Sequence, residues 1–450
     1  GVEVVGTADD VAGAVARLKS KGLNPQRLIL TKDDMPGARV RSLLAQADKL
    51  GMTLARMPRL TDFKSGVSDR MEVRPVAVED LLGRPQASLD RAAMARLIGG
   101  RRVLVTGAGG SIGGELVRQV SEFRPTEIGL LDHAEHALYS IDLETSERHP
   151  GLARRAFIAD VRDRERLARV FEAFRPELVF HAAALKHVPL VEANAVEGAT
   201  TNVLGTVNLA EEAIRGRVAA VVMISTDKAV NPTSVMGATK RIAESYCQAL
   251  DLAREAAGTR FVTVRFGNVL GSTGSVVPLF QRQLAQGGPL TVTHPDMTRY
   301  FMTVKEAVEL VLQASALGTG AANGKGGREG KIMVLDMGEP IRIMDLAEQM
   351  IRLAGFRPGK DIKIEIVGPR PGEKLSEEVF HGAEAPQPTE CPGVLLAAPR
   401  AGDLASLRPV IAELEAACRL GDQVRVLALI RKLVPEYRRE EHAAARAASA

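Results

Sequence analysis

One stretch of the chain, VLVTGAGGSIGGEL at residues 103–116, dictates a strand, a tight turn and a helix in immediate succession. An apolar run leads into three glycines, and a helical pattern follows. Gly107 permits the tight turn, Gly110 lets the backbone approach a pyrophosphate, and Gly113 allows the helix to pack closely on the strand. A glycine triplet by itself indicates little, but one at a strand–helix junction predicts a dinucleotide-binding site.

The start of this helix and the ends of the next two predicted strands extend the site. Ser111 and Ile112 add backbone N–H groups that can face the anion. IGLLD ends in Asp132, whose carboxylate can accept hydrogen bonds from both ribose hydroxyls and would repel a 2′-phosphate. NAD is therefore predicted rather than NADP, with a helix cap as the alternative for Asp132. Asp160 and Val161 are predicted to bound the adenine, with a plain turn aspartate as the alternative.

Strands and helices alternate from residue 101 to about 260, as IGLLD, RRAFIAD, LVFHAAA, AAVVMIST and RFVTVRF are each followed by helical sequence. This period predicts an α/β fold with a Rossmann-type doubly wound parallel sheet. Beyond Gly267 the pattern loosens, which predicts a smaller C-terminal substrate-binding region. Residues 1–60 predict a small N-terminal α/β domain, with a strand at VEVVG and a helix over 38–50.

A chain of 450 residues is long enough for two or three domains. The N-terminal domain lacks a phosphate loop, so a scaffold or regulatory role is predicted for it. A glycine-rich insert at 318–331 is predicted to be a surface loop. The predicted division is an N-terminal parallel α/β domain at 1–62, a connector at 63–100, the NAD-binding Rossmann domain at 101–266, a mainly substrate-binding region at 267–400, and C-terminal helices with a tail at 401–450.

Composition excludes several classes of function. The net charge is +4, from 59 basic and 55 acidic residues, Trp is absent and Tyr occurs four times. Nucleic-acid binding is therefore not predicted. Cys247, Cys391 and Cys418 lack metal-ligand spacing, so they are predicted to be reduced thiols of a cytoplasmic protein without a metal site. The chain has neither a signal peptide nor an apolar run of transmembrane length, and it starts at Gly1, so we expect an excised part of a longer protein.

The fourth strand of the Rossmann pattern ends in FHAAALKHVP. Ala182, Ala183 and Ala184 would let the nicotinamide half of the cofactor pass close to the sheet, although tight helix–sheet packing explains them as well. Lys186 is a candidate contact for a substrate phosphate. The two histidines, His181 and His187, are candidates for acid–base chemistry, but an isolated histidine is more often structural.

The fifth strand delivers Thr226, Asp227 and Lys228 to the carboxyl edge of the sheet, where open α/β folds bind ligands. A helix with Lys240 follows. A Tyr four residues before such a lysine is a common catalytic pair, but Met236 stands there and cannot transfer a proton. The sequence raises the question whether the chain is inactive or holds its acid and base elsewhere.

Six motifs occur in an order that is specific to one family: TGAGGSIG, HAAALKHVP, STDKAVNPTSVMGATKR, RFGNVLGSTGSVVPLF, TRYFM and RPGEK. They resemble the extended short-chain dehydrogenase/reductases. More narrowly, they resemble the large, membrane-anchored nucleotide-sugar 4,6-dehydratases of bacterial polysaccharide biosynthesis that act on UDP-N-acetylglucosamine. The resemblance runs from about residue 70 to 385. The transmembrane helices that precede this region in those proteins are absent from the chain.

The resemblance implies a catalytic set. The large dehydratases have Met at the position of Met236, so the missing Tyr marks a subfamily. Thr226 is expected to hydrogen-bond near O4 of the sugar, and Asp227 to protonate the departing C6 hydroxyl. Lys228 is expected to remove the C5 proton, which requires a neutral amine with a lowered pKa. Lys240 is expected to hydrogen-bond the nicotinamide ribose.

The resemblance also implies contacts with the sugar nucleotide. Asn268 is expected to touch the diphosphate or the sugar. Arg299 and Arg370 suit diphosphate oxygens through their forked, charged donors, and Glu373 can accept from ribose hydroxyls. Without the motifs, surface ion pairs would be the better reading of both arginines. His294 and Asp296 are interpreted as turn residues.

The predicted activity is NAD-dependent dehydration of UDP-N-acetylglucosamine to a 4-keto-6-deoxy sugar, with the C5 configuration retained. The alternatives are an epimerase, a dehydratase of another nucleotide sugar, or a silent NAD-binding scaffold. The resemblance also implies a homodimer, with contacts near 110–125, 195–215 and 235–255. It places the chain as a cytoplasmic domain of an inner-membrane protein.

Overall fold

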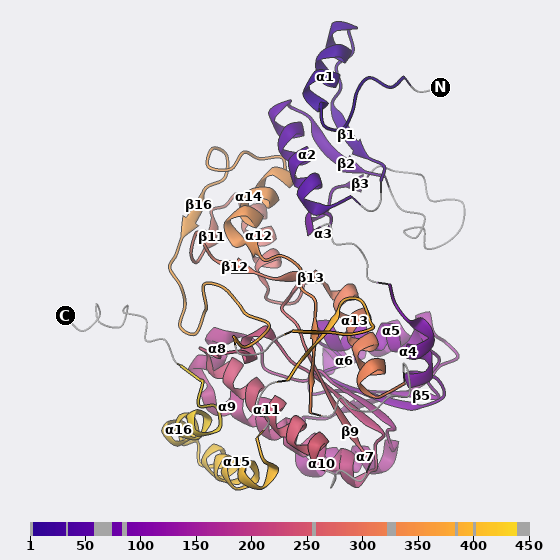
Figure 1. Cartoon of the computed structure of the whole chain (residues 1–450), viewed down its shortest axis with the longest axis vertical. Coiled ribbons are helices and arrows are strands. Elements are labelled where there is room, and N and C mark those ends of the chain that lie inside the picture. The colour runs from indigo at the N-terminus through magenta and orange to yellow at the C-terminus, as the bar shows by residue number, and fades with distance from the viewer. Residues whose placement is uncertain are drawn as a thin grey trace, which may run out of the picture. The chain divides into compact units, whose positions relative to one another are not determined.

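The structure is a computed structural model that describes residues 3–32, 35–57, 74–82, 88–253, 258–321, 330–382, 386–398 and 402–438 (Figure 1). The chain divides into two compact units, and each is described by itself. The first unit comprises Gly1–Gln86, Val276–Met297 and Ile341–Gly368. The second comprises Ala87–Ser275, Thr298–Pro340 and Pro369–Ala450.

The second unit contains a nine-stranded sheet with the order β17-β18-β14-β9-β8-β7-β4-β5-β6. The strands from β6 to β14 pair in parallel, and β18 is antiparallel to β14. Their bounds are β4 (Arg102–Thr106), β5 (Glu127–Asp132), β6 (Ala153–Ile158), β7 (Leu178–His181), β8 (Ala220–Ile224), β9 (Arg260–Arg265), β14 (Ile332–Leu335), β17 (Gln387–Pro388) and β18 (Val394–Ala397). The predicted Rossmann-type fold class is confirmed.

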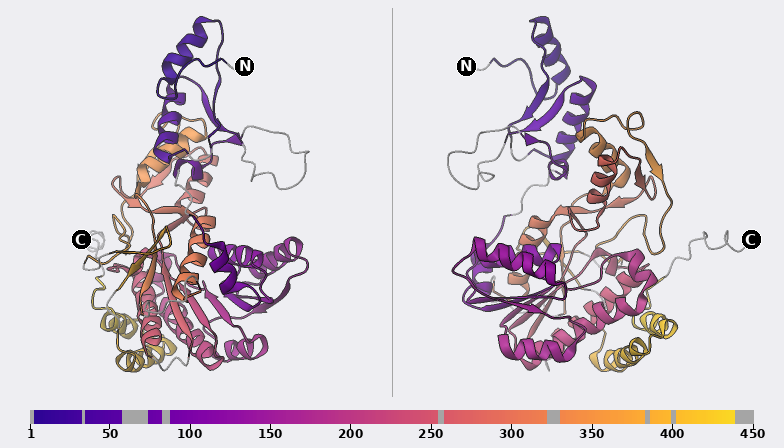
Figure 2. Two further views of the ribbon diagram at one scale, coloured as in Figure 1. Left: turned by 45° about the vertical axis from the view of Figure 1, so that its right-hand side comes forward. Right: turned by 180° about the vertical axis from the view of Figure 1, so that it is seen from behind.

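Helices cover both faces of this sheet (Figures 1 and 2). Because side chains of a strand alternate between faces, Val103 and Val105 of β4 enter one hydrophobic cluster and Leu104 the opposite one. The first cluster also holds side chains of α4 (Arg91–Ile98), α5 (Ser111–Glu122) and α13 (Val304–Gly318). The second holds side chains of α7 (Arg164–Phe174), α10 (Gly205–Arg215), α11 (Val235–Leu252) and α15 (Leu404–Arg419).

The strand order places the expected ligand site. Strand β4 lies between β5, its successor, and β7, to which the chain crosses over. Connections therefore leave β4 and β7 toward opposite sides, and open α/β folds bind ligands at the carboxyl ends of strands at such a point. The glycine-rich loop follows β4 and the alanine run follows β7, so the sequence motifs meet at this switch point.

Helix α11 is buried within the chain from Val235 to Leu250. Two C-terminal helices, α15 and α16 (Gln423–Leu433), pack against it and against α9 (Ala195–Ala199). The chain thus covers with its own helices one segment that was expected to make dimer contacts, and the homodimer stays a prediction. The predicted C-terminal helices are present, and residues 439–450 of the predicted tail lie outside the described residues.

The first unit has a small sheet in which β1 (Arg27–Leu30) and β2 (Thr53–Arg56) are parallel and β3 (Arg74–Pro75) is antiparallel to β2. Residues 3–6 of the VEVVG segment are not in a strand, so that prediction is wrong. The helix expected over 38–50 is α2 (Gly37–Lys49), whose apolar side packs with α1 (Val11–Ser20) and β2. Arg56 and Asp80 of α3 (Val78–Leu82) form a buried ion pair at 2.5 Å.

The first unit also contains two helices and a strand pair from later in the chain. These are α12 (Val276–Ala285), α14 (Ile343–Leu353) and the parallel pair of β11 (Leu290–Val292) with β16 (Ile364–Ile366). The sequence had assigned all of these segments to the region 267–400. That domain division stays a prediction, and most of the glycine-rich insert, residues 322–329, lies outside the described residues.

Candidate active site

The glycine-rich loop between β4 and α5 has the geometry that its sequence predicts. Gly107 has φ +67°, and a Cβ there would lie 2.7 Å from the backbone nitrogen of Ala183. A Cβ on Gly113 would lie 1.9 Å from the carbonyl oxygen of Gly107, so the helix packs on the loop without room for a side chain. A Cβ on Gly110 would meet its nearest neighbour only at 3.2 Å. Packing within the chain therefore explains Gly107 and Gly113 better than Gly110, which fits a role beside a ligand.

The N-terminus of α5 suits a pyrophosphate. Its N-cap is Gly110, which has no side chain to accept from the first-turn N–H groups. Ser111 and Ile112 are the first two residues of this turn, and the Ser111 hydroxyl accepts from the backbone N–H of Thr273 at 3.2 Å. An uncapped helix start at the switch point of the sheet is a ready anion site, so the residues present fit a dinucleotide.

Asp132 at the end of β5 is buried and holds the loop in place. Its Oδ2 accepts from the backbone N–H of Gly109 at 2.9 Å, and its Oδ1 accepts from that of Ala134 at 2.9 Å. Ala134 precedes α6 (Glu135–Arg148), so the carboxylate also makes the helix-start contact that was the alternative reading. Each oxygen retains a second lone pair, and the predicted ribose contact stays a prediction.

Asp160 and Val161 follow β6. Asp160 forms an ion pair with Arg162 at 2.6 Å and accepts from its backbone N–H. Burial opposes these bonds, but the net effect lowers the pKa of Asp160. Val161 is buried in the core, and its carbonyl accepts from Asn208 at 3.2 Å. Asp160 thus has the contacts of a turn aspartate, and the adenine contact remains a prediction for both residues.

The segment after β7 lies against the glycine loop, and its histidines are explained by structure. The nitrogen of Ala182 donates to Thr106, and Ala183 packs on Gly107. Both ring nitrogens of the buried His181 have hydroxyl partners, Thr106 at 2.8 Å and Thr206 at 3.1 Å. Burial, with Lys240 nearby, lowers the pKa of His181 to about 3, so the ring stays neutral.

The remaining residues of this segment are half-buried or exposed. Ala184 is half-buried, and Lys186 is exposed. His187 is the N-cap residue of α8 (Val188–Ala193). Burial, with Lys186 nearby, lowers the pKa of His187. The phosphate contact predicted for Lys186 stays a prediction.

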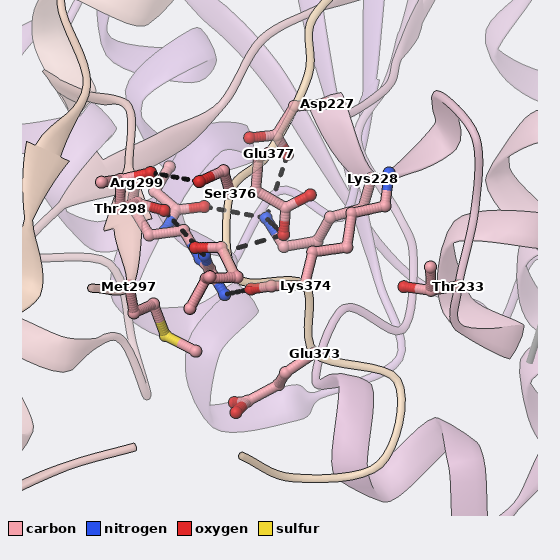
Figure 3. Close-up of polar contacts among 12 residues, drawn as sticks. Asp227, Lys228, Thr233, Met297, Thr298, Arg299, Glu373, Lys374, Ser376 and Glu377 are labelled. Atoms are coloured by element: carbon pink, nitrogen blue, oxygen red, sulfur yellow. Dashed lines mark hydrogen bonds and ion pairs between the residues drawn. The ribbon is translucent and has the colours of Figure 1, made fainter. Parts of the chain in front are cut away.

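Thr226, Asp227 and Lys228 follow Ser225 at the end of β8 and form a compact hydrogen-bonded group. Figure 3 shows Asp227 and Lys228 of this group. Asp227 is fully buried, and its Oδ1 accepts from the Thr226 hydroxyl at 2.9 Å and from Lys228 Nζ at 3.0 Å. Its Oδ2 has no hydrogen-bond partner among the described residues. Lys228 Nζ also donates to Asn268 Oδ1 at 2.9 Å, which brings a predicted substrate residue of β10 (Asn268–Leu270) to the triad.

A second carboxylate and an arginine complete this group. Glu377 Oε1 lies 3.5 Å from Lys228 Nζ and 3.8 Å from Nε of Arg299, which is in β12 (Thr298–Arg299). Burial lowers the pKa of Lys228, but the charges of Asp227 and Glu377 outweigh it, so the net pKa is raised. The expectation of a lowered pKa for Lys228 is therefore wrong, because Asp227 first and Glu377 second stabilise the charged amine against burial.

Lys240 shows the shift that was expected of Lys228. It is buried in α11, and its Nζ donates to the carbonyl of Ile224 at the end of β8 at 2.6 Å. Burial lowers its pKa to about 8, against the opposing effect of Glu244. Met236, one turn earlier, is 3% exposed and belongs to an apolar cluster with Val191. It fills space where the common pair would have a phenol.

The segment RPGEK lies beside the residues that follow Lys228 in sequence. Arg299 donates through Nη1 and Nη2 to the carbonyls of Thr298, Lys374 and Leu375 at 2.7, 2.8 and 3.2 Å. Its guanidinium is thus bound to the chain itself, and the predicted diphosphate contact stays a prediction. Arg370 is exposed, and Glu373 accepts from its backbone N–H at 3.2 Å, closing a turn.

Four residues of this site escaped the sequence reading. Glu377 is described above, and Lys374 donates to the carbonyl of Val230 at 2.8 Å. A Cβ on Gly237 would lie 2.1 Å from the carbonyl oxygen of Lys228, and one on Gly267 would lie 3.0 Å from Asp227 Oδ2. The glycines in GATK and FGN could have indicated that the chain packs closely around the triad. Nothing in the local sequence distinguishes Glu377 from its neighbour Glu378.

A cavity of about 550 Å³ lies elsewhere in the second unit. Among the described residues that line it are Thr200, Asn208, Tyr246 and Arg408, and none of the predicted site residues is among those that line it. The cavity is therefore separate from the triad. The chemistry available at the triad is proton transfer by a buried carboxyl and an amine, next to a loop suited to a dinucleotide.

This fold with this site defines the class of the chain as an extended short-chain dehydrogenase/reductase. The family described as polysaccharide biosynthesis protein matches residues 103–399. The chain belongs to this family, and the predicted resemblance to extended short-chain dehydrogenase/reductases of polysaccharide biosynthesis is confirmed. Its narrower part, the membrane-anchored type that acts on UDP-N-acetylglucosamine, stays a prediction.

Three similar proteins illustrate the relationship. The capsular polysaccharide biosynthesis protein CapD of Staphylococcus aureus is 47% identical over 384 residues, which cover 85% of this chain and 61% of that protein. The structure of Pen from Bacillus thuringiensis is 31% identical, with a TM-score of 0.59 and coverage of 70% of this chain and 99% of Pen. DesIV of Streptomyces venezuelae, a dTDP-glucose 4,6-dehydratase solved as a double mutant with NAD and DAU bound, is 25% identical, with a TM-score of 0.53 and coverage of 62% and 88%.

The chain thus spans about three fifths of the length of the capsular relative. No helix in the part of the chain that the structure describes is long and apolar enough to cross a membrane. Across the same ranges, no group of three or more His, Cys, Asp or Glu side chains is arranged to hold a metal ion.

Proposed function

We propose that this chain catalyses the NAD-dependent dehydration of UDP-N-acetylglucosamine to UDP-2-acetamido-2,6-dideoxy-4-keto-hexose, with the configuration at C5 retained. The observation that carries this proposal is the buried Asp227–Lys228 pair, 3.0 Å apart, at the carboxyl edge of β8. Similarity to a capsular polysaccharide protein and to a 4,6-dehydratase solved with NAD supports it. The cofactor of that dehydratase agrees with the NAD predicted from Asp132.

Elimination of water from a sugar requires an acid and a base at adjacent carbons. The C5 proton is not acidic until C4 carries a ketone, and the C6 hydroxyl leaves only if it is protonated. Bound NAD would supply the redox chemistry, by accepting hydride from C4 and returning it to C6. An acid–base pair held together in one site meets the remaining need.

The raised pKa of Lys228 means that the resting pair is an ion pair, with the proton on the amine. Lys228 becomes a base when this proton passes over the 3.0 Å to Asp227 Oδ1. The same transfer makes Asp227 the acid that the C6 hydroxyl needs. The proton transfer leaves the net charge of the pair unchanged. A bound substrate that excludes water makes the ion pair less stable relative to the neutral pair. Removal of the C5 proton by Lys228 and protonation of O6 by Asp227 release water and restore the ion pair. Lys228 then returns a proton to C5 as C6 is reduced, and solvent, which takes up the O4 proton during oxidation at C4, reprotonates the amine.

The other members of the site have binding tasks in this proposal. Thr226, which donates to Asp227 Oδ1, would hydrogen-bond near O4 of the sugar. Asn268 contacts the sugar or its diphosphate, with Arg370 and Glu373 toward the nucleotide. The homodimer, the cytoplasmic location and attachment to the inner membrane rest on the resemblance alone.

A 4-epimerase is the second candidate, and a dehydratase of another nucleotide sugar is the third. An epimerase needs a proton acceptor at O4 but no acid at C6, so the buried Asp227–Lys228 pair favours elimination. A silent NAD-binding scaffold would have no use for two buried carboxylates around one lysine.

Proton NMR of the protein with UDP-N-acetylglucosamine in deuterated water, without added reductant, tests the proposal. A new C6 methyl signal with deuterium at C5 is the expected result, and its couplings report the C5 configuration. A change of configuration at C4 alone would establish the epimerase. Unchanged substrate with NAD bound would exclude this sugar nucleotide and turn the search to others, then to the scaffold.

A further inference from the structure

Glu377 is a buried carboxylate that neither the motifs nor the proposed steps use. It is 6% exposed and lies in the irregular segment 369–378. Its Oε1 faces two cations, Lys228 at 3.5 Å and Arg299 at 3.8 Å. Its Oε2 has no hydrogen-bond partner in the part of the chain that the structure describes. Burial of a charge with so few hydrogen bonds lowers the stability of the fold, so the position of Glu377 calls for a functional explanation.

The chain fixes this position from β12 (Figure 3). Arg299 binds the carbonyls of Lys374 and Leu375, and the backbone N–H of Thr298 donates to Leu375 at 3.0 Å. The Thr298 hydroxyl donates to Ser376 Oγ at 2.9 Å. The residues immediately before Glu377 are therefore clamped, and its carboxylate is directed toward Lys228 rather than to solvent.

The four charges in the group balance. Asp227 and Glu377 are acidic, and Lys228 and Arg299 are basic, so the group as a whole has no net charge. Arg299 is held by main-chain carbonyls whether or not Glu377 is charged. Lys228 depends on the two carboxylates, because its other partner, Asn268, is neutral. Removal of the Glu377 charge would leave two cations facing one anion.

We propose that Glu377 is a positioning residue of the dehydration: as the second counter-ion of Lys228, it keeps the Lys228 amine charged at rest and in place between Asp227 and Asn268. This inference rests on the proposed function. Glu378, its neighbour in sequence, has no such part, since it is exposed and bonds with Asn231 at 2.8 Å.

The inference predicts a pH dependence with a definite sign. The charged groups facing Lys228 are Asp227 on its own turn, Arg299 on β12 and Glu377 on the segment 369–378, while β10 offers only the neutral Asn268. The reacting pair needs one proton, so activity is lost when pH rises through the pKa of Lys228. Because that pKa is raised, loss of this proton should not lower the kcat of the NAD-loaded wild type below about pH 10, near the ordinary value of lysine. Without the Glu377 charge, the loss should begin at least about one pH unit lower.

The experiment compares kcat as a function of pH for wild type, E377Q, E377D and the matched control E378Q, each loaded with NAD. In parallel, reductive methylation of Lys228 at each pH, quantified by peptide mass spectrometry without substrate, follows the neutral amine directly. We expect E377Q to move both the alkaline limb of kcat and the methylation midpoint to lower pH. E377D keeps the charge, so its alkaline limb and its methylation midpoint should lie close to those of wild type. E378Q should match wild type.

The outcomes separate this inference from the proposed function. A shifted methylation midpoint in a protein that turns over no nucleotide sugar would sink the dehydration while the counter-ion role of Glu377 survived. Turnover with unshifted midpoints in E377Q would overturn the inference and leave the dehydration standing. Should E377Q unfold, the E377D–E378Q comparison decides, since a purely structural Glu377 would lower activity equally at every pH.

Discussion

The two halves of the site are built in opposite ways. The dinucleotide half is made of backbone: Gly107 and Gly113 bring main-chain atoms so close that an added Cβ would overlap them. The catalytic half is made of charged side chains: Lys228 Nζ lies 3.0 Å from the carboxylate of Asp227 and 3.5 Å from that of Glu377. The first half leaves N–H groups open to an anion, whereas the second encloses its charges and pairs each with an opposite charge.

This difference teaches where each half is vulnerable. A backbone site fails when a side chain is added, because nothing in it can move aside. A charge cluster fails when a single charge is removed, because the partner is left buried without compensation. Substitutions that add a methyl group to the loop and substitutions that remove one charge from the cluster should therefore affect different measurements.

The largest effect should come from the carboxyl of the reacting pair. D227N removes the acid for O6 while it keeps the shape of the side chain, so kcat should fall by about 10²- to 10⁴-fold. NAD binding should not change, because Asp227 lies on the charged half. Asp163 caps α7 from an exposed position, and Asn caps as well as Asp, so D163N is the matched control. Loss of NAD together with activity in D227N would mean that the two halves are not separate.

The next effect should come from the loop. G113A places a methyl group 1.9 Å from the Gly107 carbonyl oxygen, so α5 must move. Overpacking of this kind costs roughly 1–3 kcal/mol of stability, and NAD affinity should fall at least about tenfold. Calorimetric titration with NAD and thermal unfolding would measure both. Gly151 has open space around its Cβ position, so G151A should behave as wild type; equal losses in both variants would contradict the packing argument.

The same contrast explains what the sequence could reveal. The loop is local: a strand, a turn and a helix within residues 102–122 determine it, and Asp132 follows at the end of the next strand. The doubly wound sheet is predictable for a related reason, since buried parallel strands read as continuous apolar runs. Both predictions depend on neighbours in sequence, and the structure agrees with both.

The charge cluster is assembled from distant segments. Lys228, Asn268, Arg299 and Glu377 come together only in the fold, so the sequence could indicate each motif but not their distances. The direction of the pKa shift of Lys228 was misjudged because Asp227 and Glu377 oppose burial, and no local pattern marks Glu377. Lys240 was the opposite case, since burial alone decides its direction.

A smaller effect should appear in the pH dependence of NAD binding. With a pKa of about 8, Lys240 is largely charged at pH 7 and largely neutral at pH 9. If its charge supports the nicotinamide ribose, NAD affinity should decline as pH rises through about 8, by roughly fivefold, the difference between a charged and a neutral hydrogen-bond donor. Titrations with NAD at several pH values would show it. In K240M the affinity should be weak and flat, and a decline that persists in K240M would assign the effect to another group.

The smallest effect should follow replacement of Met236, the residue at the usual tyrosine position. Met236 is 3% exposed and packs in an apolar cluster, where it offers volume and no proton. M236L conserves that volume, so it should cost less than about 1.5 kcal/mol and leave kcat unchanged. M236Y should instead lose stability, because it adds bulk and buries a hydroxyl. Thermal unfolding and kcat of the two variants distinguish these cases. A rise of kcat in M236Y would contradict this expectation. It would show that the charge cluster lacks a proton acceptor, and that a phenol at position 236 can supply it.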